Sequence, residues 1–217
     1  MTTFPGSPKV LRGGIVLIDN TTAAVQRIIA LQYNPDTLTR SLQIKGVSGE
    51  SGDQLEALRL KGPPIETIQL EAELDATDQL ASANPTSTEL GLHPQLAALE
   101  AIIYPTSNQL LQHRSDAAAG SIEIAPAQGP LCVFIFGSKR IMPVRITEFS
   151  ITEEAFDIAL NPIRAKINLS MRVLSVDDLG FDSKGGGLFM TYLQAKEQLV
   201  TKFSEAQFAE LGIDGIS

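Results

Sequence analysis

The alternation of apolar and polar residues along the chain predicts a protein built mainly of β-strands. It is clearest in residues 63–75 and, over a longer stretch, in residues 163–176. A period of two is typical of antiparallel strands with one buried and one solvated face. The residues expected to face the core are Ile68, Leu70, Ala72 and Leu74 in the first stretch, and Ala165, Ile167, Leu169, Met171 and Val173 in the second. Further strands are predicted within residues 9–19, 122–124, 131–136, 141–151 and 156–160.

Residues 27–42 predict a β-hairpin near the start of the domain. An apolar segment with Ile28 and Ile29 precedes residues 34–36, Asn-Pro-Asp, and Leu38 and Leu42 follow at even positions. Proline fixes φ in a turn, and short Asn and Asp side chains bond to their own backbone. This local chemistry favours a tight bend between two paired strands.

Helical patterns are fewer. Residues 92–104 predict one internal helix, with Leu96, Leu99 and Ile103 on a shared face, whereas residues 106–120 are ambiguous. Residues 179–187 contain three successive glycines, which is typical of a hinge. Residues 188–211 predict a C-terminal helix whose apolar stripe must dock on its own domain or on another chain. We therefore expect a β-domain over residues 1–180 and a linker with a helical extension over residues 181–217.

Composition excludes several functions. The chain of 217 residues has a net charge of −8 and no cluster of Lys and Arg, which argues against nucleic-acid recognition. No apolar run is long enough to cross a bilayer, so membrane insertion is not expected. No signal peptide is apparent at the N-terminus. The single cysteine, Cys132, lies in an apolar run and is interpreted as a buried, inert thiol, which suits a reducing compartment.

No catalytic, cofactor or metal site is predicted, and we expect the protein not to be an enzyme. His93 and His113 have no partner at a metal-ligand spacing. Residues 153–154 and 177–178 are acidic pairs, which we assign to solvated turns, and Asp75 is assigned to capping. The glycines at 185–187 lack the order of a phosphate-binding loop.

Four segments together resemble the tube-type proteins of contractile injection systems, a family that includes baseplate tube initiators. The segments are residues 27–42 (RIIALQYNPDTLTRSL), 62–80 (GPPIETIQLEAELDATDQL), 91–105 (GLHPQLAALEAIIYP) and 129–175, which contains GPLCVFIFGSKRIMPVRITEFSIT and NPIRAKINLSMRVLS. The resemblance spans roughly residues 10–176 in the expected order. Many baseplate relatives continue into a LysM domain, whereas the single helix predicted after residue 187 is too short for that fold, so no LysM domain is expected here.

The resemblance implies two antiparallel sheets packed as a tail-tube-like barrel or sandwich with one internal helix, an α+β fold that is mainly β, plus the C-terminal helix. It implies a homohexameric ring that starts the inner tube and contacts inner-tube, hub, spike and baseplate proteins. Such a protein is made in the cytoplasm and assembled into a phage tail-like particle. Two alternatives remain: the polymerising inner-tube subunit itself, or a small β-barrel that binds an apolar ligand.

Candidate contacts between subunits come from three regions. By the resemblance, residues 46–54 are a candidate arm to a neighbouring ring, and strands at residues 63–75 and 163–176 are expected to contribute to sheet continuity around the ring. The long final strand carries cations on its outward face, and the C-terminal helix offers an apolar stripe. The candidate residues are Gly49, Glu50, Ser51, Asp53, Arg164, Lys166, Arg172, Leu193 and Phe203.

Overall fold

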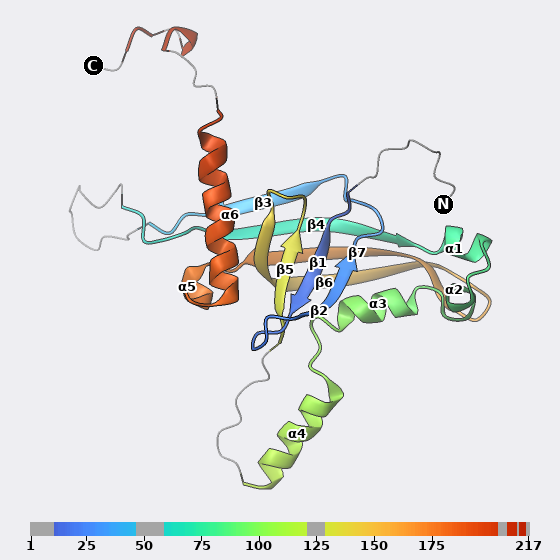
Figure 1. Ribbon diagram of the computed structural model, residues 1–217. Coiled ribbons are helices and arrows are strands. Elements are labelled where there is room, and N and C mark those ends of the chain that lie inside the picture. The colour runs from blue at the N-terminus through green and yellow to red at the C-terminus, as the bar shows by residue number, and fades with distance from the viewer. Residues whose placement is uncertain (1–10, 47–58, 121–128, 204–207, 212, 216–217) are drawn as a thin grey trace.

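A single antiparallel sheet forms the centre of the molecule in the computed structural model, which describes residues 11–46, 59–120, 129–203, 208–211 and 213–215 (Figure 1). Within these residues the sheet has seven strands in the order β2-β1-β5-β6-β7-β4-β3. The strands are β1 (Gly14–Ile18), β2 (Val25–Ala30), β3 (Leu38–Gln43), β4 (Ile65–Asp75), β5 (Leu131–Ile135), β6 (Ile141–Phe156) and β7 (Pro162–Val173).

The predicted hairpin over residues 27–42 is wrong, because β2 and β3 do not pair. β2 pairs with β1, β3 pairs with β4, and the two strands lie at opposite ends of the strand order. The Asn-Pro-Asp segment is a connection between the two edges. Asn34 accepts a hydrogen bond from the Gly13 amide at 2.9 Å, while Gln32 bonds to both backbone polar groups of Asp75, at 2.7 and 3.0 Å.

These contacts require a strongly curved sheet. Gly13 precedes β1 and Asp75 ends β4, and three strands lie between β1 and β4. In a flat sheet β1 and β4 would be about 19 Å apart, whereas Gln32 and Asn34 are only two residues apart in the chain. The long strand β6 makes the bend, because its first residues pair with β5 and the rest with β7, with a register shift between Ile146 and Glu148.

The predicted division into two sheets is therefore wrong: one continuous, open sheet folds over the main core, and a smaller apolar cluster around Leu131 and Val133 lies beside Leu179 and Leu188. The core joins side chains from both halves, with Ile15 and Phe134 on one side and Ile68, Ile167 and Met171 on the other. The inward residues expected in β4 and β7 are all buried, which confirms the alternation there. The broad α+β class is correct, and the fold is mainly β.

The prediction of one internal helix is also wrong, because the described residues between β4 and β5 already contain four helices. They are α1 (Thr77–Ala81), α2 (Pro85–Leu90), α3 (His93–Glu100) and α4 (Ser107–Ala118). α3 covers part of the core with Leu96 and Leu99, as predicted, but Ile103 is exposed and Ile102 is buried in its place. The predicted strand at residues 122–124 lies outside the described residues.

The C-terminal part of the chain contains α5 (Val176–Leu179), α6 (Lys184–Val200) and a short 3₁₀ helix, η2 (Phe208–Leu211). The three glycines that we interpreted as a hinge instead form the first turn of α6, and Gly185 and Gly186 are buried. A Cβ atom on Gly186 would overlap the carbonyl oxygen of Gly180. The glycines therefore let α6 begin in close contact with the turn after α5.

Candidate functional site

The outward side of strands β3, β4, β7 and β6 is a continuous polar surface, which we call the polar face. The strand register aligns its side chains in rows that cross the four strands. One row contains Glu148, Ser170, Gln69 and Thr39, and the neighbouring row contains Ser150, Asn168 and Glu71. A shallow groove of about 450 Å³ crosses these rows. Hydroxyl, amide and carboxylate groups thus dominate the middle of the polar face.

The three predicted cations of β7 lie on the polar face, and each has a carboxylate partner within the chain. Arg164 contacts Asp75 at 3.1 Å, Lys166 contacts Glu154 at 3.8 Å, and Arg172 contacts Asp178 at 2.6 Å. Their role as contacts between subunits is not tested by these pairings. The ion pairs do show that the cations balance local acids along the strand.

Asp75 is not the cap residue of α1, which is Ala76 without a side-chain cap hydrogen bond; Asp75 bonds instead to Thr77 within the turn that joins β4 to α1. Its carboxylate accepts hydrogen bonds from the Thr77 side chain and amide, which, with smaller contributions from Arg164, hold the pKa of Asp75 below its ordinary value despite partial burial. Asp75 thereby fixes the start of α1 and the end of β4 together.

A buried charged cluster lies on the opposite, inward side of the sheet, beneath α6. Glu66 of β4 is 4% exposed and contacts the guanidinium of Arg40 from β3 at 2.6 Å and Lys196 of α6 at 3.1 Å. The Tyr192 hydroxyl lies 3.0 Å from the same carboxylate, and the Lys196 ammonium lies 4.1 Å from the Tyr192 ring centre. Desolvation acts to raise the pKa of Glu66, but the bonds from Arg40 and Lys196 outweigh it and lower that pKa. The cluster fastens α6 to the β3 edge.

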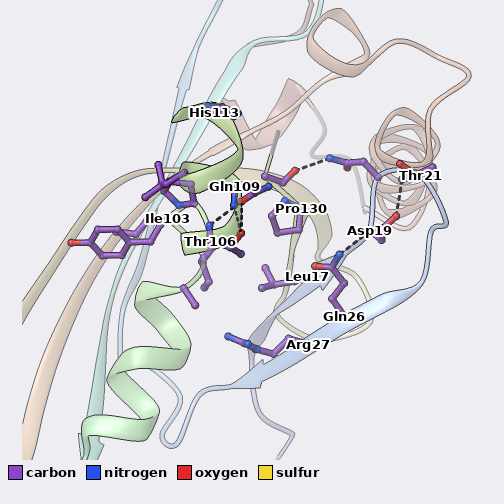
Figure 2. A pocket seen from close by; sticks show the side chains of 17 residues that line it. Leu17, Asp19, Thr21, Gln26, Arg27, Ile103, Thr106, Gln109, His113 and Pro130 are labelled. Carbon is purple, nitrogen blue, oxygen red and sulfur yellow. Dashed lines mark hydrogen bonds between the residues drawn. The ribbon is translucent and has the colours of Figure 1, made fainter. Parts of the chain in front are cut away.

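An open pocket of about 750 Å³ lies at the other edge of the sheet, between the β1–β2 turn and the start of α4 (Figure 2). Leu17, Ile102, Pro105 and Pro130 supply apolar lining, and Leu110 extends it along α4. The polar lining residues are held in place by hydrogen bonds to one another. Gln26 donates a hydrogen bond to Asp19 at 2.9 Å, and Thr106 and Gln109 bond to each other as a capping box. We call this pocket the β2–α4 cleft.

The two edge strands carry exposed apolar residues. Within the described residues β2 and β3 each pair with one strand only, whereas β4 and β7 are paired on both sides. The contribution of the strands at residues 63–75 and 163–176 to sheet continuity around a ring stays a prediction, made from inside the sheet of each copy. Val25 and Ile28 of β2 and Leu42 of β3 are exposed. Free edges of this kind are templates for pairing with another chain.

The remaining predicted contact residues have different surroundings. Gly49, Glu50, Ser51 and Asp53 lie outside the described residues. Leu193 is partly buried and packs against the core, whereas Phe203, beyond the end of α6, is exposed.

Sequence reasoning missed the Glu66 cluster, although a signal was available. Glu66 occupies an even position in a strand whose other even positions, from Ile68 to Leu74, are apolar and buried. A carboxylate in that phase must face the core and requires partners. Its partners Arg40, Tyr192 and Lys196 come from distant parts of the chain, so the sequence alone could not identify them.

Neither a scan against protein-family models nor a search of curated proteins finds a match for this chain. Among the described residues, no group of three or more His, Cys, Asp or Glu side chains is arranged to hold a metal ion. A search of the same residues finds no helix with the length and apolar character needed to span a membrane.

Proposed function

We propose that this chain is a ring-forming structural component of a contractile injection system, a tube initiator that links the hub and spike of the baseplate to the inner tube. The proposal rests on the resemblance of four segments within residues 27–175 to tube-type proteins. The structural observation that supports it best is the open sheet with two free edges of different sequence, β2 and β3.

Two unlike edges favour a ring over a symmetric dimer. If β3 of one copy pairs with β2 of the next, each copy uses two different surfaces, and the contact is head to tail. A head-to-tail contact closes into a ring when the rotation per copy divides a full turn. Strand addition supplies main-chain hydrogen bonds, and the exposed Val25 and Ile28 supply apolar contact. The ring size of six comes from the resemblance alone.

The polar face would then line the solvent-filled channel of the ring. Its rows of Ser, Thr, Asn and Gln side chains, with acids paired to Arg164 and Lys166, form a hydrated lining. Such a lining suits a channel through which other molecules pass without binding.

The alternatives receive less support. A barrel that binds an apolar ligand needs an empty interior, but Phe134, Met142 and Met171 are fully buried between the two halves of the sheet. The polymerising inner-tube subunit has the same requirements for ring formation. We favour the initiator because α6 projects from the domain and offers a contact that a barrel alone does not provide (Figure 1).

Electron microscopy of particles from producing cells, with and without this gene, tests the proposal. The initiator role predicts that the deletion leaves hub-bearing baseplates without tube or sheath. Intact particles of normal length in the deletion strain would refute the proposed function and favour the alternative of a barrel that binds an apolar ligand.

Edge pairing has its own test in the purified protein. A lysine on an edge strand opposes pairing with another chain. Ile28→Lys on β2 and Thr39→Lys on β3 are each expected to abolish rings in sedimentation and negative-stain images. Ile158→Lys, in the exposed β6–β7 turn, is the matched control and should leave rings intact. Rings formed by both edge variants would contradict edge pairing.

A further inference from the structure

The apolar stripe of α6 continues beyond the domain that it covers. Phe189 and Tyr192 are buried in the core, whereas Leu199 and Val200, about two turns beyond Tyr192, are 46% and 71% exposed, and Phe203, just past the end of the helix, is 73% exposed. Leu199 and Val200 follow Tyr192 by seven and eight positions, about two helical turns, so they lie on the same side of α6 as Tyr192. Figure 1 shows the C-terminal half of α6 standing clear of the sheet. The second half of the stripe therefore has no cover among the described residues.

The helix α4, on the opposite side of the molecule, also carries apolar residues that nothing covers among the described residues. No residue of α4 is buried, and Leu110 and Leu111 are 55% and 61% exposed. A capping box at Thr106 and Gln109 stabilises its start. Nevertheless, isolated helices of about 12 residues are marginal in water, and most helices are stabilised by burial of one side. α4 is therefore a preformed surface that lacks a partner within the described chain.

Each of these surfaces belongs to one of the two free sheet edges. Arg40 of β3 bonds to Tyr192, in the middle of α6, at 3.1 Å, so this part of the helix is fixed at the β3 edge, whereas the first turn of α6 packs beside Leu131 of β5. The β2–α4 cleft is lined by Gln26 and Arg27 of β2 together with Leu110 of α4. If β3 of one copy pairs with β2 of the next, the projecting end of α6 is carried towards the cleft of that next copy.

We infer that Leu199 and Val200 at the end of α6, with Phe203 just beyond it, dock in the β2–α4 cleft of the adjacent copy and pack against its Leu110 and Leu111. This inference rests on the proposed ring and its edge pairing. The cleft volume of about 750 Å³ is within the range of sites that enclose a ligand of several apolar groups. We assign the occupant as a second copy of this chain because the end of α6 lies near the β3 edge and the β2–α4 cleft lies at the β2 edge. Pairing of these two edges between copies therefore involves both surfaces.

The contact joins unlike surfaces, which permits a complementation experiment. One variant, Val200→Asp with Phe203→Asp, loses the projecting surface, and a second, Leu110→Asp with Leu111→Asp, loses the receiving surface. Each change places charges in the apolar contact, and we expect self-association to weaken roughly thirty-fold, as for loss of an interface hot spot. Mixing the two variants restores one intact contact per pair, and the expected product is a dimer by sedimentation velocity.

Controls separate this inference from the proposed function. Ile158→Asp, at an exposed apolar residue far from both surfaces in the sequence, should associate like the unmodified protein. Rings that persist in both double variants but disappear in Ile28→Lys would overturn the docking of α6 and leave the ring proposal standing. An unmodified protein that stays monomeric at every concentration would overturn both. Failure of the mixed variants to form a dimer, with the circular dichroism of each unchanged, would also overturn the docking.

Discussion

The buried carboxylate of Glu66 should be one of the largest single contributors to the stability of the fold. Its side chain is 5% exposed, and two cations, Arg40 and Lys196, share it. Glu66→Gln keeps the shape but removes the charge, so the two cations lose their common partner and face each other. We therefore expect the variant to be destabilised, with α6 loosened from the β3 edge.

The size of the stability loss expected for Glu66→Gln depends on how exposed its partners Arg40 and Lys196 are. Breaking a fully buried pair costs about 3–5 kcal/mol, and each hydrogen bond to a charged group contributes about 1.5–3 kcal/mol. Water reaches Arg40 and Lys196, whose side chains are 28% and 37% exposed, and this access reduces the cost. We expect a loss of about 2–3 kcal/mol in the free energy of unfolding, or roughly 5–10 °C in Tm for a chain of this size.

Urea denaturation followed by far-ultraviolet circular dichroism measures this loss. Glu154→Gln is the matched control, because it removes the same charge from an ion pair of 3.8 Å whose side chains are 38–39% exposed. The control should lose less than about 0.5 kcal/mol. Equal losses for the two variants would refute the view that burial makes the Glu66 cluster strong.

Acid should remove the difference in stability between the unmodified protein and Glu66→Gln. The pKa of Glu66 is lowered in the folded state, so its carboxylate stabilises the fold fully above the ordinary carboxyl pKa. That contribution disappears as pH falls through the lower, folded pKa. The stability gap between the unmodified protein and Glu66→Gln should therefore be constant near neutrality and shrink progressively below about pH 4.5.

Three further predictions concern other contacts. Gly186→Ala should destabilise the fold by about 3 kcal/mol in thermal unfolding, because a Cβ there meets backbone, whereas Gly187→Ala, with open space, should stabilise it by up to about 1 kcal/mol. Burial raises the pKa of Cys132 to about 11, so a maleimide should label it much more slowly in native than in urea-unfolded protein, and equal rates would contradict its burial. Gln32→Ala should cost about 1–2 kcal/mol in urea unfolding through the loss of two hydrogen bonds to β4, and no loss would mean that this tie between distant strands is dispensable.

Alternation predicted the strands that lie inside the sheet. The inward residues of β4 and β7 were identified correctly because their whole length is buried on one side, and that environment imposes a strict period of two. Burial of Cys132 was predicted correctly for the same reason, since the apolar run around it forms β5.

Strand pairing was not predictable in the same way. The Asn-Pro-Asp segment has genuine turn chemistry, but a turn does not specify which strands it brings together. Here the decisive contacts come from Gln32 and Asn34, which reach β4 and the residues before β1. The glycines at the start of α6 were interpreted wrongly as a hinge. Glycine is favoured both where the backbone is flexible and where it packs closely against another segment, and here it packs against the preceding turn.

Sequence reasoning recognised the cations of β7 and the apolar end of α6 but could not place the surfaces opposite them. A single apolar residue such as Leu110 carries little information in a short helix, and the β2–α4 cleft exists only because the β1–β2 turn lies beside that helix. Sites assembled from separate segments require the fold before they can be seen.

The placement of β1 between β2 and β5 has a consequence for synthesis on the ribosome. The β1–β2 hairpin leaves the ribosome early, but Ile15 of β1 pairs with Phe134 of β5, about 120 positions later. At translation rates of about 5–20 residues per second, the hairpin waits roughly 6–24 s with its apolar side uncovered. β4 likewise has no β7 to pair with until β7 has been synthesised. The nascent chain thus passes through a long interval in which its first strands can be captured by other chains, and the sheet is completed only when the last strand arrives.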